Sequence, residues 1–185
     1  MKTISTALMA GCLALATAGV AAAQDNPMVG GAAMSADKTI VENAAASADH
    51  TTLVAAVQAA GLAETLQGEG PFTVFAPTNA AFEALPAGTV ETLLKPENKE
   101  QLTTILTCHV VGANAMSEAI GKMIADDGGK HTVATLGGCA LTAQAMDGKI
   151  TLTDENGNVA TVTIADVVQS NGVIHVIDKV LLPKG

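Results

Sequence analysis

The sequence is poor in the residues that bind nucleic acids. All nine basic residues are lysines, so arginine is absent, and Trp and Tyr are absent as well. Eighteen Asp and Glu residues give a formal net charge of −9. Because phosphate contacts depend on Lys and Arg, and base stacking depends on aromatic side chains, this composition argues against nucleic acid as a partner.

Long apolar runs are missing beyond the N-terminus. Hydrophobic residues make up 49% of the 185-residue chain, but alanine supplies much of this, and no later stretch is apolar enough to span a bilayer. The length fits one domain with a core of its own. The acidic charge favours a monomer that avoids anionic surfaces.

Residues 1–23 have the pattern of a secretory signal peptide. Lys2 supplies a positive start, an apolar stretch follows, and three alanines before Gln24 form a cleavage pattern. An N-terminal membrane anchor is the alternative. We expect an exported protein that is periplasmic, at the cell surface or secreted. Residues 24–36 are small and polar with a Gly-Gly pair, and are expected to form a flexible linker.

The chain has few cysteines, and only Cys108 and Cys139 lie beyond the leader. In an oxidising compartment two cysteines allow a single disulfide, which would stabilise the fold by about 3–4 kcal/mol in the chain-entropy model. Two buried free thiols are the alternative. Neither cysteine belongs to a C-x-x-C pair, so the pattern does not indicate redox catalysis.

Helical patterns dominate the first part of the chain and strand patterns dominate the second. Apolar residues recur at helical spacing in several segments between residues 37 and 126. Beyond Gly129 the spacing becomes two, and an Asp-Gly and an Asn-Gly pair are hairpin signals. Residues 72–75 are expected to form an early strand, and residues 173–177 a strand buried on both faces. Helices first and strands later predict an α+β fold.

Two blocks of the sequence resemble the two signature blocks of the fasciclin-like domain. The first is GPFTVFAPTNAAF at residues 70–82, and the second is NGVIHVIDKVLLP at residues 171–183. Between them, LTCHVV at residues 106–111 is similar to the tyrosine–histidine segment of the family. The resemblance implies a fasciclin-like domain over residues 37–184, in which N-terminal helices flank a wedge of mostly antiparallel β-strands.

The resemblance also implies a function. Members of this family are exported, secreted or surface-attached, act in adhesion or extracellular interaction, and have no established catalytic centre. We therefore expect a non-catalytic interaction module that helps cells adhere, with an unknown surface or matrix macromolecule as partner. Cys108 replaces the tyrosine that usually precedes His109. Because that segment is implicated in integrin contact in animal members, an integrin-type role is not carried over.

The family motifs contain the candidate binding residues. They are Thr78, Asn79, His109, Asn171, His175 and Asp178. The first two have a structural alternative as helix caps, and the two histidines have one as buried neutral imidazoles that donate to backbone carbonyls. Gly172 is expected to permit a tight turn. The other two histidines, His50 and His131, are expected to be exposed.

No motif indicates catalytic residues, a metal site or a cofactor. The four serines beyond the leader lie outside a G-x-S-x-G pattern, and no phosphate loop or dinucleotide fingerprint occurs. Residues 154–158 lack the spacing of a calcium loop, so a hairpin tip is expected there. Two alternatives stay open. One is a carrier of an apolar, carotenoid-like molecule, with Met116, Ile120 and Met123 lining a groove. The other is a hydrolase that uses the two motif histidines.

Overall fold

The computed structural model describes residues 26–184, so the signal peptide expected at residues 1–23 lies outside the described part. The helices are α1 (Ile40–Ala46), the 3-10 helix η1 (Ala48–His50), α2 (Thr51–Ala60), α3 (Ala63–Gln67), α4 (Asn79–Glu83), α5 (Thr89–Leu93), the 3-10 helix η2 (Pro96–Asn98), α6 (Lys99–Thr107) and α7 (Ser117–Asp126). The strands are β1 (Met28–Val29), β2 (Ala32–Ala33), β3 (Phe72–Pro77), β4 (Val110–Val111), β5 (Lys130–Ala134), β6 (Ala140–Met146), β7 (Lys149–Thr153), β8 (Val159–Gln169) and β9 (Gly172–Ile177). Within residues 26–184, no helix combines the length and apolarity needed to cross a membrane.

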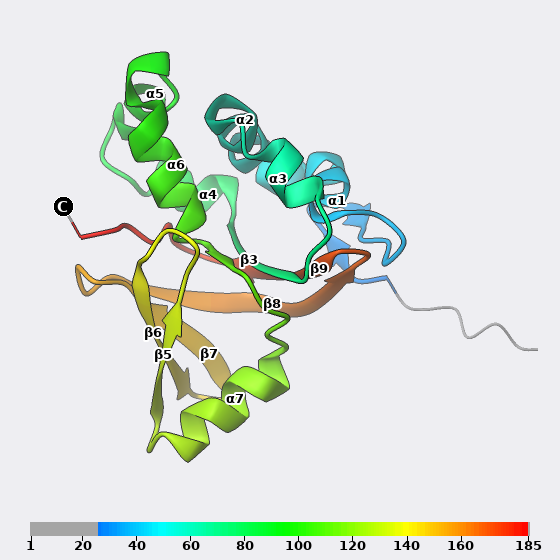
Figure 1. Cartoon of the computed structure of the whole chain (residues 1–185), viewed down its shortest axis with the longest axis vertical. Helices are drawn as coiled ribbons and strands as arrows, with labels where there is room; N and C mark the ends of the chain where they lie inside the picture. The colour runs from blue at the N-terminus through cyan, green and yellow to red at the C-terminus, as the bar shows by residue number, and fades with distance from the viewer. Residues whose placement is uncertain (1–25, 185) are drawn as a thin grey trace, which may run out of the picture.

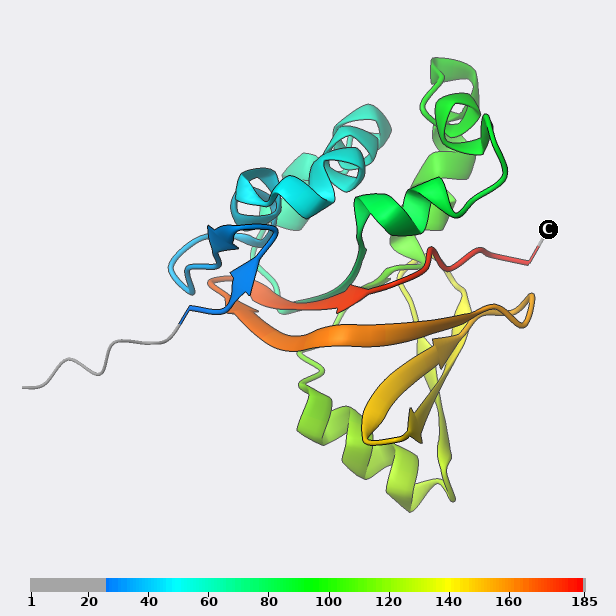
Figure 2. The ribbon, with the colours of Figure 1, turned by 180° about the vertical axis from the view of Figure 1, so that it is seen from behind.

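Seven strands form one sheet in the order β4-β3-β9-β8-β7-β6-β5. In this sheet β3 and β9 run parallel, and every other neighbouring pair is antiparallel. Helices α1 to α6 stand over the β3 and β9 end, whereas α7 lies beside β5, β6 and β7 on the opposite side of β8 (Figures 1 and 2). The predicted α+β class and the mostly antiparallel wedge are confirmed.

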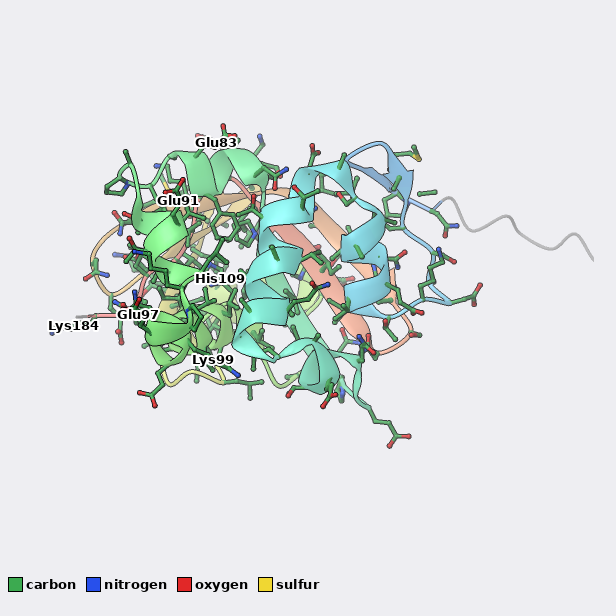
Figure 3. The ribbon with its side chains drawn as sticks, turned by 90° about the horizontal axis from the view of Figure 1, so that it is seen from above. Glu83, Glu91, Glu97, Lys99, His109 and Lys184 are labelled. Carbon is green, nitrogen blue, oxygen red and sulfur yellow. A yellow bond between two sulfur atoms is a disulfide. The ribbon has the colours of Figure 1, made fainter. Side chains whose placement is uncertain are left out.

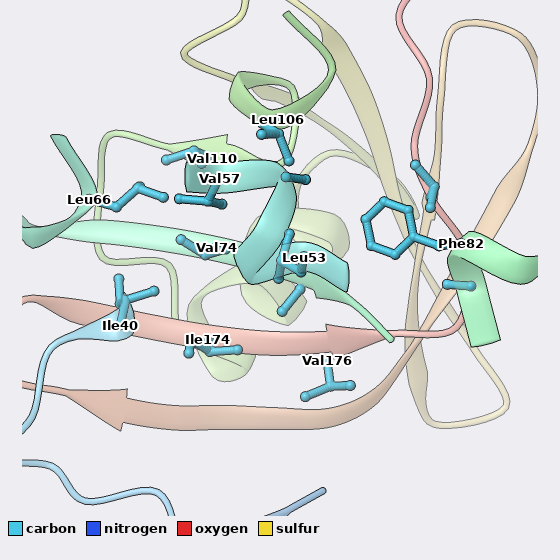
Figure 4. Close-up of a cluster of buried hydrophobic side chains, with 14 of the residues drawn as sticks. Ile40, Leu53, Val57, Leu66, Val74, Phe82, Leu106, Val110, Ile174 and Val176 are labelled. Atoms are coloured by element: carbon cyan, nitrogen blue, oxygen red, sulfur yellow. The ribbon is translucent and has the colours of Figure 1, made fainter. Parts of the chain in front are cut away.

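The apolar side chains form two cores that share β9. The first core lies between the helices and the sheet and includes Ile174 and Val176 (Figure 4). The second core lies under α7 and includes Phe75 and Ile177. Because successive side chains of a strand point to opposite faces, β9 supplies both cores, and all six of its residues are buried. The prediction of a strand buried on both faces is confirmed.

A capping box fixes the start of α1. The Thr39 side chain accepts a hydrogen bond from Glu42 N, and the Glu42 carboxylate accepts one from Thr39 N at 2.9 Å. Two N–H groups at the helix start are thereby satisfied, which fixes this boundary. Helix α2 ends at Gly61, which has a φ of 74°, a left-handed conformation that glycine adopts readily.

Part of the expected flexible linker is packed on the domain. Strands β1 and β2 form a hairpin through Gly30 and Gly31, both of which have positive φ. The side chains of Val29 and Met34 are 3% and 2% exposed and join the first core. Ser35 N donates to the Asn43 side chain at 3.1 Å. The prediction of a flexible segment is wrong here because the glycines serve a tight turn and two apolar residues anchor it.

The packing of this hairpin gives the first prediction. Met34→Ala should lower the free energy of unfolding by about 2–4 kcal/mol, because it removes a buried side chain from a core. Met28→Ala is the matched control, since Met28 is 62% exposed in the same hairpin and its loss should change stability by less than about 0.5 kcal/mol. Urea unfolding followed by circular dichroism measures both. Equal effects would contradict the packed hairpin.

Candidate functional site

The six candidate residues do not converge on one site. Thr78 and Asp178 follow the carboxyl ends of the parallel strands β3 and β9, whereas Asn171 precedes the amino end of β9. His175 lies inside β9, and His109 follows α6 in the interior of the fold (Figure 3). The residues are therefore spread along the parallel pair, and each is described by its own contacts.

Two candidates form the start of helices. The Thr78 side chain accepts from Ala81 N at 3.3 Å and caps α4. Asn79 reaches across to another helix, where its Oδ1 accepts from Thr52 N at 3.0 Å and its Nδ2 donates to Ala48 O at 2.8 Å. Asn79 thereby caps α2 from the first signature block. The structural alternative weighed for these two residues accounts for their contacts.

Asn171 and Asp178 join segments that are distant in sequence. Asn171 Oδ1 accepts from Ile40 N at 3.1 Å, and its Nδ2 donates to two carbonyls at the end of α3, including Leu66 O at 2.7 Å. One side chain thus ties α1 and α3 to the start of β9. Asp178 Oδ1 accepts from Thr161 N at 2.7 Å and joins the end of β9 to β8.

Both ring nitrogens of His109 are used by the backbone. Leu181 N donates to Nε2 at 2.9 Å, so the proton of the neutral ring lies on Nδ1, which donates to Ile105 O at 2.8 Å. Desolvation of the buried ring lowers the pKa of His109 to about 4, although the Ile105 carbonyl and Asp154 oppose the shift. His109 is therefore neutral at pH 7, as expected for a buried imidazole.

His175 is held in the same manner. Its Nε2 donates to Ala115 O at 2.7 Å and its Nδ1 accepts from Asp166 N at 3.2 Å, while the ring stacks on Phe75 at a centroid distance of 5.6 Å. Burial lowers the pKa of His175, opposed by the Ala115 carbonyl and Asp166. The prediction of buried, neutral, hydrogen-bonded imidazoles is confirmed for both motif histidines.

This geometry argues against the hydrolase alternative. A general base needs a ring nitrogen that can reach the nucleophile, and both nitrogens of each motif histidine face backbone groups. Ser117, Asp166 and His175 are neighbours, but the Ser117 hydroxyl donates to the Asp166 carboxylate, and His175 meets the Asp166 backbone N–H. The order of contacts is not that of a nucleophile, a base and an orienting acid.

The prediction that His50 is exposed is wrong. The ring is 2% exposed at the junction of η1 and α2, and its Nδ1 lies 2.9 Å from Ser47 Oγ. Burial lowers the pKa of His50, partly offset by the Ala76 backbone and by Asp49. The surrounding sequence is polar and gave no sign of burial. His131 is partly exposed, with its Nδ1 2.6 Å from Asp127 Oδ2.

Cys108 and Cys139 form a disulfide with a Cα–Cα distance of 5.3 Å. The bridge joins the end of α6 to the turn between β5 and β6, next to His109. Gly137 N also donates to Thr107 O at 3.0 Å, so backbone contacts support the same junction. Within residues 26–184, no group of three His, Cys, Asp or Glu side chains is placed to hold a metal ion.

The three side chains expected to line an apolar groove on α7 are not those of the pocket beside this helix. Ile120 is buried, and Met123 packs against the second core. The pocket beside α7 is lined by other residues, such as Ser117, Gly121 and Ile150. A small apolar cavity of about 30 Å³ lies elsewhere, between α2, β3 and α6, with room for about two waters. A carotenoid-like molecule could enter this cavity only if the helices separated.

Asn171→Ala tests whether a polar residue of the signature blocks stabilises the fold. The variant removes the hydrogen-bond partner of the Ile40 N–H group and of two backbone carbonyls. It should therefore lower the free energy of unfolding by about 2–4 kcal/mol. Asn114→Ala is the control, because Asn114 is exposed near the same end of the sheet, and should change stability by less than about 0.5 kcal/mol. A stable Asn171→Ala protein would contradict the structural role.

Comparisons with known proteins relate this chain to one family. A family model described as Fasciclin domain matches residues 48–183. Protein sll1483 of Synechocystis sp. is 58% identical over 132 residues, which cover 71% of this chain and 66% of that protein. Transforming growth factor-beta-induced protein ig-h3 of Sus scrofa is 40% identical over 131 residues, which cover 71% of this chain and 17% of that protein. The chain thus spans just under two thirds of the first relative and a small part of the second.

Among solved structures, the FAS1 domain pair from the insect cell adhesion molecule Fasciclin I is similar, with a TM-score of 0.69. The match covers 78% of this chain and 51% of that chain at 18% sequence identity, so it shows a shared fold. The family model carries the assignment further, because its match includes both signature blocks and the histidine segment between them, and sll1483 is 58% identical to this chain. The chain belongs to the fasciclin domain family.

Proposed function

We propose that this protein is a non-catalytic interaction module that acts outside the cytoplasm in adhesion between cells or between a cell and a surface. The observation that carries the proposal is the Fasciclin domain match over residues 48–183. The similar solved structure comes from Fasciclin I, an insect cell adhesion molecule. The partner is a surface or matrix macromolecule, and the module acts as a monomer.

Two features of the chain support this proposal. The disulfide between Cys108 and Cys139 suits an oxidising compartment, in line with the signal peptide predicted for residues 1–23. Both ring nitrogens of His109 and of His175 form backbone hydrogen bonds, so neither ring is free to act as the general base of the hydrolase alternative. The carrier alternative is weakened by the small size of the apolar cavity.

Deletion and complementation test the proposal. Loss of the gene should reduce attachment of the host cells to surfaces or to each other, and the full chain should restore it. A chain that lacks residues 2–23 is the matched control, because the folded domain would be made without the predicted export signal and should not restore attachment. Attachment that is unchanged by deletion on several surfaces would contradict the adhesion role. Restoration by the control would contradict export.

A further inference from the structure

The segment that follows β9 is partly buried without belonging to a strand. Residues 178–184 have no ladder partner, although they continue directly from β9 (Figures 1 and 2). Val180 and Leu181 are 5% and 0% exposed. Leu181 joins the second core, whereas Val180 and Leu182 join the first. Asp178 N still donates to Thr161 O at 3.2 Å, but the N–H groups of residues 181, 182 and 184 are bonded to side chains.

Side chains from two distant places supply these bonds. Leu181 N donates to His109 Nε2 at 2.9 Å. Leu182 N donates to Asp154 Oδ2 at 3.0 Å, and Lys184 N donates to Glu155 Oε2 at 3.1 Å. The adjacent Asn156 Nδ2 donates to the carbonyls of residues 182 and 183 at 3.1 and 3.0 Å. The junction after α6 and the β7–β8 turn together hold the segment.

The three acceptors of backbone N–H groups can all take up a proton. The neutral His109 ring carries its proton on Nδ1, so a second proton would sit on Nε2 and face the N–H of Leu181. Protonation of Asp154 or Glu155 converts a charged acceptor into a weaker neutral one. Asp154 also accepts from Asn158 N at 2.9 Å, so its protonation loosens the turn as well. Protonation at these acceptors would therefore weaken the bonds to the N–H groups of Leu181, Leu182 and Lys184.

The other charged groups near the segment do not oppose its release when the carboxyl groups are protonated. Lys179 and Lys184 belong to the segment itself, and protonation of the two carboxyl groups removes negative charge close to them. On the α4 side, a groove is lined by apolar residues such as Ala84 and Leu85, together with Val180 and Leu182 of the segment. Glu83 of α4 is exposed. Asp178 is bonded to Thr161 N instead.

We propose that residues 180–184 form an acid-releasable segment. Acidification detaches its backbone from His109, Asp154 and Glu155 while the sheet stays folded. Release uncovers the apolar side chains of Val180 and Leu182 and the groove along α4. This inference concerns the conformation of the chain, and it stands whether or not the protein acts in adhesion.

Hydrogen exchange of the folded, disulfide-bonded chain tests the proposal. The amides of residues 181, 182 and 184 should lose protection by about tenfold or more between pH 7.5 and 4.5, after correction for intrinsic exchange. Burial keeps the bound His109 ring neutral down to a pKa of about 4, whereas a released ring titrates near 6.5, so the contact weakens as the pH falls below 6.5. The amides of Ile174 and Val176 in β9 should keep their protection. Loss of both sets together, or retention of both, would overturn the proposal.

A variant that imitates the protonated state gives a second test at neutral pH. Asp154→Asn replaces a carboxylate oxygen that accepts from Leu182 N, and should reduce protection of the amides of residues 181, 182 and 184 about tenfold or more at pH 7.5. Asp147→Asn is the control with the same charge change in an exposed turn at a φ of 52°, which Asn tolerates. Glu155→Gln, on an exposed side chain, should affect mainly Lys184 N. Equal behaviour of Asp154→Asn and Asp147→Asn would contradict the proposal.

Discussion

The fold depends on the close parallel contact between β3 and β9, where the two signature blocks meet. Phe72 N donates to Asn171 O at 3.1 Å, and the pairing then runs from Phe72–Gly172 to Pro77–Ile177. A side chain at Gly172 would collide with the Phe72 carbonyl, and one at Gly70 would collide with the Asn171 carbonyl. Glycine is therefore required at both positions by close approach of the two backbones.

The polar signature residues extend this contact to the rest of the molecule. Asn171 ties the start of β9 to α1 and α3, and Asn79 at the other end of the pair caps α2. His109 and His175 connect the interior to the C-terminal segment and to the start of α7. A single sheet with two unequal cores is held in register by these few side chains.

Much of the fold could be predicted from the sequence because the patterns are local. Helical spacing, the switch to strand spacing and the mostly apolar run of β9 identify the elements, and the two blocks identify the fold class. The burial of the motif histidines also followed from their apolar neighbours. The contacts of Asn79 and Asn171 did not follow, since their partners lie 27 and 131 residues away, respectively.

The failures have the same origin. The expected tight turn lies at residues 170–171, directly before Gly172, but the φ of Gly172 is not positive, and the constraint on it comes from Phe72 across the sheet. His50 lies in a polar stretch and becomes buried only when η1 packs near β3. The N-terminal hairpin was expected to be a flexible linker because small residues and glycines occur both in linkers and in tight hairpins. Each of these features depends on long-range packing, which composition and spacing do not report.

The stability of Gly172→Ala tests the central claim most directly, with Gly121→Ala as the matched control. The added methyl at Gly172 would meet backbone, whereas at Gly121 in α7 it would meet open space. Urea unfolding should show a loss of about 2–3 kcal/mol for Gly172→Ala and a gain of up to about 1 kcal/mol for Gly121→Ala. A Gly172→Ala protein as stable as the unmodified chain would show that the close contact between the two signature blocks does not organise the fold.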